Sequence, residues 1–131
     1  MEDAAILWLQ RDEAVTQPHF QLTSLIDIDD RLEAHLDGIR IANHDHPDVG
    51  WEVCRRELQW GEPGEVFTAA VLALEFGVKD RLQCVVDIAR HSFDNSRALA
   101  SALEWLSYDM IELRLREWFV DADIFMRQIA I

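Results

Sequence analysis

The segment 65–76 limits the folds open to this chain more than any other, because its apolar residues surround the whole helical circumference. Val66, Phe67 and Leu72 fall on different sides of such a helix. A helix that is apolar all round is stable only when neighbours cover several of its sides. Its longest apolar run, 69–74, is far shorter than the ~18 residues of a membrane-spanning helix. We therefore predict a central buried helix and no membrane partner.

The rest of the chain also shows the periodicity of helices. Only three prolines and five glycines interrupt it, and the apolar residues between them recur at spacings of three and four. No segment predicts a strand convincingly. The expected helices span 2–16, 26–42, 49–60 and 65–76, and later ones begin near Asp80, Asp94, Asp109 and Asp121. We therefore predict an all-α fold of about seven or eight helices in one domain.

The first two helices are predicted to be two-faced. In the helix 2–16, which Pro18 ends, the inward residues are expected to be Ala5, Trp8 and Leu9. In the helix 26–42, the inward stripe is expected to be Ile28, Leu32, Leu36 and Ile39. The opposite face of that second helix carries an acidic row of Asp30, Glu33 and Asp37.

The stretch 43–48, Asn-His-Asp-His-Pro-Asp, is polar and contains a proline, which is typical of a loop. We expect it to be the longest surface loop. It would separate an acidic N-terminal region, 1–48, from a repeat region, 49–131, within the single helical domain.

A short repeat supports stacked hairpins in the second region. The sequence Ala-Leu-Glu-Phe at 73–76 recurs as Ala-Leu-Glu-Trp at 102–105, a displacement of 29 residues, and an aspartate follows each copy. Two helices in about 30 residues are typical of stacked helical hairpins, although an ordinary bundle with a chance echo is the alternative. The apolar end, 127–131, lacks a polar cap, so we expect that a further repeat or a second copy of the chain covers it.

Two blocks, 31–40 and 60–75, resemble an uncharacterised family of proteobacterial HEAT-repeat proteins. Some members of that family are associated with type VI secretion loci. The resemblance implies HEAT-like stacked hairpins and a binding role, and it implies no catalytic residues and no cofactor.

The charge of the chain restricts its partners. With 25 acidic against 12 basic residues, its formal net charge is −13, which argues against nucleic-acid binding because that needs cations to replace phosphate counterions. Region 1–48 holds 11 acidic and three basic residues. The acidic row Asp30, Glu33 and Asp37 is therefore a candidate surface for a basic protein, and a solubilising face is the alternative.

The aromatic residues and cysteines supply further candidates. Trp105 and Trp118 fit the repeat core, whereas Trp8 and Trp51 are candidate anchors of an interface. The two cysteines lie 30 residues apart within apolar patterns, so we interpret them as small buried residues. The N-terminus lacks the basic region of a secretory signal, which predicts a cytoplasmic protein.

Catalytic signals are weak. His44 and His46 could hold zinc, nickel or iron if Asp48 or His35 came within reach, which would make the chain a metal-dependent hydrolase or oxygenase. In a polar loop such residues are more often simply solvated. The serines lack the Gly-x-Ser-x-Gly pattern of a nucleophile elbow, and the sequence contains no His-Glu pair.

We therefore predict a non-catalytic protein-interaction module, with no metal or cofactor, in which Asp30, Glu33 and Asp37 attract a basic partner and Trp8 and Trp51 anchor it. An adaptor or immunity protein that binds a secreted effector is one concrete form of this hypothesis. The alternatives are the enzyme built on His44 and His46, and a structural module that forms a homo-dimer through its apolar C-terminal end.

Overall fold

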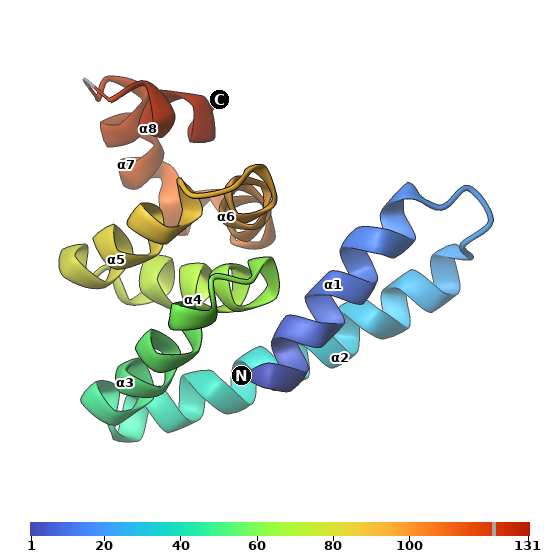
Figure 1. Ribbon diagram of the computed structural model, residues 1–131. Coiled ribbons are helices and arrows are strands. Elements are labelled where there is room, and N and C mark those ends of the chain that lie inside the picture. Colours follow the sequence, from blue (N-terminus) through green and yellow to red (C-terminus); the bar gives the residue numbers. More distant parts are fainter. Residues whose placement is uncertain (122) are drawn as a thin grey trace.

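The structure, a computed structural model, describes residues 1–121 and 123–131. This described part contains eight α-helices and a 3-10 turn, and no strand (Figure 1). The elements are α1 (Glu2–Thr16), α2 (Leu22–Asp45), α3 (Pro47–Glu57), η1 (Leu58–Trp60), α4 (Pro63–Phe76), α5 (Lys79–Ala89), α6 (Phe93–Trp105), α7 (Tyr108–Phe119) and α8 (Ile124–Ile129). The predicted all-α fold is confirmed.

Helix α4 lies at the centre of the molecule, as its sequence predicts. Ten of its 14 residues are buried, namely Gly64 and the whole stretch from Val66 to Leu74. It packs against α1, α3, η1, α5, α6 and α7. Gly77 ends the helix with a φ of 65°, a left-handed conformation that glycine adopts without steric cost. The surrounding helices are therefore arranged around one apolar helix.

The two copies of the short repeat lie on neighbouring helices. Helices α4 and α6 pack side by side, and Ala73 and Ala102, the first residues of the two copies, are both fully buried. Helix α5 packs against both α4 and α6, and α8 packs against α7 and α6. Figure 1 shows α4, α6 and α8 following one another across the molecule. The chain after Gly61 thus forms helical hairpins whose first helices are in contact.

The aspartates expected to cap these helices lie near their starts, but different residues occupy the N-cap positions. Ser92 caps α6 by accepting a hydrogen bond from the Asn95 backbone N–H, and Asp123 caps α8 by accepting one from Phe125. Asp80, Asp94 and Asp109 lie instead in the first turns of α5, α6 and α7. Negative charge is favourable in a first turn because the helix dipole is positive there.

Helices α1 and α2 form an antiparallel arm whose turn projects away from the other helices in Figure 1. The bounds predicted for α1 are confirmed, and Ala5 and Trp8 are buried. Leu9 is 42% exposed, because α1 turns its Ala4 and Trp8 face toward α2 and α4. In α2, Ile28, Leu32 and Leu36 are buried as predicted, and Ile39 is half-buried against the core.

The surface loop expected at residues 43–48 is wrong. Helix α2 continues to Asp45, the single residue His46 joins the helices, and Pro47 opens α3. Proline is favoured in the first turn of a helix, where its missing N–H would have no partner in any case. Asn43 is only 3% exposed, and a Cβ added at Gly50 would lie 2.3 Å from its Oδ1 atom. This stretch is therefore part of the contact between α2 and α3 and not a surface loop.

One contiguous core runs through the molecule. Its buried residues extend from Ala4 to Met126, so they come from both of the regions that the sequence distinguishes. Cys54 is 2% exposed and lies within this core, and burial raises the pKa of its thiol to about 11. Cys84 is half-buried, and both cysteines are free thiols.

Two glycines test this packing. A Cβ at Gly64 would lie 2.6 Å from the Ala5 carbonyl oxygen, whereas a Cβ at Gly38, inside α2, would meet nothing within 4 Å. We expect Gly64→Ala to reduce the free energy of unfolding by about 1–3 kcal/mol, because α1 must move away from α4. Gly38→Ala should increase it by about 0.5–1 kcal/mol, because alanine is the better helix former.

Urea unfolding followed by circular dichroism measures both changes. Equal effects of the two substitutions would contradict the close contact between α1 and α4.

Candidate functional site

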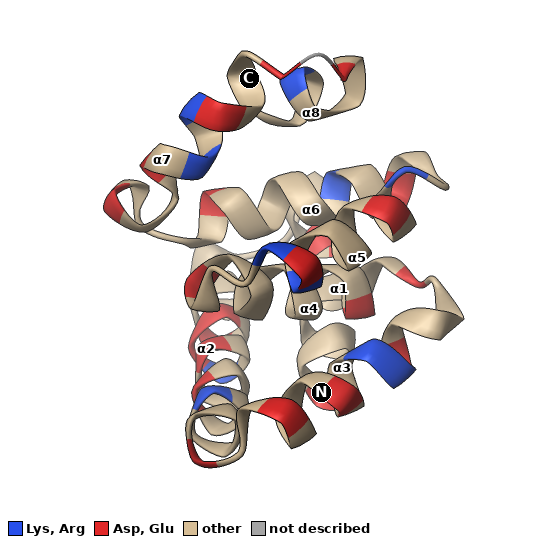
Figure 2. Ribbon diagram, turned by 90° about the vertical axis from the view of Figure 1, so that its left-hand side faces the viewer, with Lys and Arg blue, Asp and Glu red and all other residues tan. Residues whose placement is uncertain are grey.

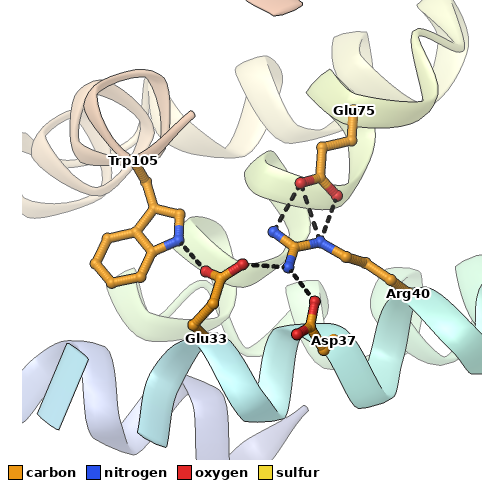
Figure 3. Close-up of polar contacts among 5 residues, drawn as sticks. All are labelled: Glu33, Asp37, Arg40, Glu75 and Trp105. Carbon is orange, nitrogen blue, oxygen red and sulfur yellow. Dashed lines mark hydrogen bonds and ion pairs between the residues drawn. The ribbon is translucent and has the colours of Figure 1, made fainter. Parts of the chain in front are cut away.

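A cluster of polar side chains surrounds Arg40 on α2, and Figure 3 shows its members. The guanidinium donates from Nε to both carboxylate oxygens of Glu75, at 3.0 and 2.9 Å, and from Nη2 to Glu75 Oε1 at 2.7 Å. Its Nη1 donates to Asp37 Oδ1 at 2.7 Å and to Glu33 Oε1 at 2.5 Å. Glu75 lies in the last turn of α4, so the cluster joins α2 to the central helix.

The electrostatics of the cluster are unequal. Burial of Arg40 favours its neutral form, but the hydrogen bonds to Glu75, Glu33 and Asp37 outweigh that effect and raise the pKa of the guanidinium. The Arg40 side chain is 22% exposed and that of Glu75 is 11% exposed, so this pair is largely shielded from water. Three carboxylates meet one guanidinium, which leaves a surplus of two negative charges.

An aromatic group continues the cluster toward α1 and α6. Trp105 Nε1 donates to Glu33 Oε2 at 2.7 Å, and the Arg11 guanidinium lies 5.3 Å from the centre of the Trp105 ring. Phe67 packs its ring edge-to-face with Trp105 and stacks on Trp8. Arg11 also pairs with Asp29 at 2.7 Å. Glu33 therefore connects α2 with α6 as well as with Arg40.

The predicted acidic row has a mixed role. Asp30 is exposed and pairs with no cation in the part of the chain that the structure describes. Glu33 and Asp37 bind Arg40 within α2, and Glu33 also binds Trp105 of α6, while their side chains stay 44% and 62% exposed. Figure 2 shows further acidic segments along α2.

Neither of the two tryptophans predicted as interface anchors is exposed. Trp8 is 2% exposed, and its Nε1 donates to Ser101 Oγ at 3.1 Å, so it belongs to the core and cannot anchor a partner. Tryptophan is apolar enough for a core wherever its N–H finds an acceptor. Trp51 is half-buried, packs against the core and lies under the Arg81 guanidinium, 5.5 Å from its ring centre.

An apolar groove borders the Arg40 cluster. We name it the α2–α4–α7 groove, a concavity of about 480 Å³ lined by Arg40, Ile41, His44, Asp45, Glu75, Phe76 and Met110. Its apolar residues are open to solvent, with exposures of 66% for Ile41, 39% for Phe76 and 52% for Met110. The sequence places Ile41 four residues after Asp37 on α2, but it could not place Phe76 and Met110 beside them.

A second concavity, of about 340 Å³, lies between α5, α7 and α8. Its charges are largely paired, Arg90 with Asp123 at 2.5 Å and Arg114 with Glu117 at 2.7 Å. The hydrogen bond from Arg90 lowers the pKa of Asp123. Because these charges nearly cancel, this concavity lacks the acidic surplus beside the α2–α4–α7 groove.

The histidines considered as metal ligands are not gathered into a site. The His44 side chain is 86% exposed, and its Nδ1 lies 3.4 Å from Asp45 Oδ1. His35 lies near Asp3, at 4.0 Å, and not near His44. Among residues 1–121 and 123–131, no group of three or more His, Cys, Asp or Glu side chains could hold a metal ion.

No family model, curated protein or solved structure matches the chain. No helix in the described residues combines the length and the apolarity needed to cross a bilayer. The function is therefore inferred from the geometry of the described side chains.

A double-mutant cycle tests the Arg40 cluster. We expect Arg40→Ala and Glu75→Ala to be coupled by about 1–3 kcal/mol in the free energy of unfolding, because each change leaves a shielded charge without its partner. The control is the pair Arg55 and Glu52, which is 49% and 62% exposed and should couple much more weakly. Urea unfolding of the single and double variants measures both. A coupling near zero for Arg40 and Glu75 would mean that the cluster does not join α2 to α4.

Proposed function

We propose that this protein is a non-catalytic protein-interaction module that binds a basic protein through the acidic side of α2. The observation that carries the proposal is the surplus of carboxylates around Arg40, next to exposed apolar side chains. An interface of this kind uses charge to steer the partner and apolar contact to hold it.

The arrangement of charges supports a basic partner specifically. Asp30 is free of cations within the described residues, and Asp37 and Glu33 keep much of their surface in solvent although they bind Arg40. A partner cation can therefore approach them without displacing Arg40. The chain as a whole is acidic, so its long-range electric field attracts a basic partner, as the local carboxylates do.

The stacked hairpins and the resemblance to HEAT-repeat proteins suggest the concrete form of the proposal. It is a cytoplasmic adaptor or immunity protein whose partner is a secreted effector. In this form, the helices after Gly61 provide a rigid support and the α1–α2 arm provides the charged surface.

Asp30 gives the cleanest test of steering, because Glu33 and Asp37 also contribute to the fold. Partners captured from the native cell are identified by mass spectrometry, and a purified partner is mixed with the protein in a stopped-flow instrument. We expect Asp30→Asn to lower the association rate about two- to threefold at low salt, and the difference to vanish at high salt.

The matched control is Asp87→Asn, which removes the same charge from α5, a helix outside the acidic side of α2. It should lower the rate less. An association rate that changes neither with salt nor with Asp30→Asn would refute binding through this acidic surface.

Self-association is a second candidate, and a separate groove favours it. This groove, of about 400 Å³ between α6, α7 and α8, has a mostly apolar lining that includes Leu103, Ile111 and Ile129, with Glu104 as its charged member. For a chain with a formal charge of −13, such a charge-poor surface is where two copies repel each other least.

If the groove pairs two copies, light scattering should give a mass that rises with concentration toward a dimer. Ile131→Asp, a change at a residue that is 93% exposed, should abolish the rise. A constant monomer mass would exclude this candidate.

A further inference from the structure

We propose that the α2–α4–α7 groove receives an amphipathic helix of the basic partner, which inserts an apolar side chain between Ile41, Phe76 and Met110 and places one cation on Asp45, in the groove, and another on Asp37, beside it. This inference rests on the proposed function and deepens it, because it specifies the conformation and the charge spacing of the partner.

The groove has the shape and the apolar lining to receive side chains of a partner. Three exposed apolar side chains from three different helices converge on it, Ile41 from α2, Phe76 from α4 and Met110 from α7. Because no single helix supplies this group, it is not the apolar stripe of one surface helix. A concavity of about 480 Å³ accepts one or two large side chains of a partner, and anchors of this kind dominate binding energies.

The backbone of the occupant finds no strand edge here. Strand addition gives an extended peptide main-chain hydrogen bonds, but the described part of the chain offers no strand with which to pair. A segment that makes its backbone hydrogen bonds internally is therefore favoured. A helix does so, and it lays one apolar face into a groove.

Two exposed acids of α2 lie in or beside the groove. Asp45 lines it, and Asp37 pairs with Arg40, another lining residue, with side chains 67% and 62% exposed. Eight residues separate them, which corresponds to about 12 Å along α2. The two carboxylates also lie about 80° apart around α2, whereas cations at positions i and i+7 of a partner helix are about 10.5 Å apart on one face, so long, flexible basic side chains are needed to reach both.

Arg40, which lies between these acids, does not oppose such a partner. Its guanidinium is bound by three carboxylates, which more than balance its charge, and its side chain is 22% exposed. The same bonds restrain the rotamers of Glu75 and Arg40 before any partner arrives. Side chains that are already ordered lose less entropy on binding.

The probe is an alanine-based peptide of about 18 residues with a fluorescent label, which carries lysine at i and i+7 and leucine at i+3. Fluorescence anisotropy measures its affinity for the whole protein. We expect Met110→Arg to weaken binding about tenfold or more, because a cation enters the anchor site. Ile41→Ala should also weaken it, through the loss of apolar contact.

The matched control is Leu113→Arg. Leu113 lies on α7 as Met110 does, is 78% exposed and does not line the groove, so the same charge is added outside the site. The affinity of the peptide for this variant should stay within about twofold of its affinity for the unsubstituted protein. Circular dichroism verifies that every variant keeps its helices.

Two further peptides test the conformation and the spacing. A central proline should abolish binding because it breaks the helix, and lysines at i and i+2 should weaken it because they point to different sides. Equal losses for Met110→Arg and Leu113→Arg, or undiminished binding of the proline peptide, would overturn the inference. If the first peptide fails to bind while Asp30→Asn still slows the natural partner, the helix-in-groove inference is wrong and the proposed function stands.

Discussion

The burial of α4 on all sides is the constraint on which the rest of the structure depends. From Val66 to Leu74 every residue is buried, so this helix exists in the folded state only while its neighbours remain around it. Gly64 shows how tight the arrangement is, since a single methyl group there would meet the backbone of α1. The apolar sides of α4 consequently determine where its neighbours lie, namely α1, α5, α6 and α7.

Helix α2 depends on α4 in a different way. Its apolar stripe enters the common core, but the end of α4 is also fixed to it by an ion pair, Arg40 with Glu75. Glu33 adds a hydrogen bond to Trp105 of α6. An ion pair shielded from water needs good geometry and further hydrogen bonds to offset the desolvation of its charges, and the carboxylates of Glu33 and Asp37 supply them here. The acidic row is therefore part of the fold as well as a surface.

Periodicity alone was sufficient to predict the helices and the central place of α4, because the spacing of apolar residues along the sequence indicates which sides of a helix are buried. It failed where a local signal has two readings. Pro47 is typical of a loop, yet it is equally suited to the first turn of α3. Ser92 and Asp94 are both good caps, and only the path of the backbone selects Ser92.

The candidate site was less accessible to prediction, because its parts are distant in the sequence. Asp30, Glu33 and Asp37 could be placed on one face of a helix, but Glu75 lies 35 residues after Arg40, and no local pattern connects them. The burial of Trp8 likewise depends on a hydroxyl 93 residues away, that of Ser101. Contacts of this range follow from the packing of helices around α4 and not from periodicity.

The juxtaposition of charge and apolar surface then has a structural origin. Arg40 draws three carboxylates to the place where α2 meets the end of α4, and the side chains next in line on those helices, Ile41 and Phe76, are left at the same edge without a cover from the described chain. Because the ion pair joins the two helix segments, it fixes the spacing of the backbones that carry Ile41 and Phe76. This surface is both acidic and apolar, and the proposed partner, a basic amphipathic helix, has the complementary properties.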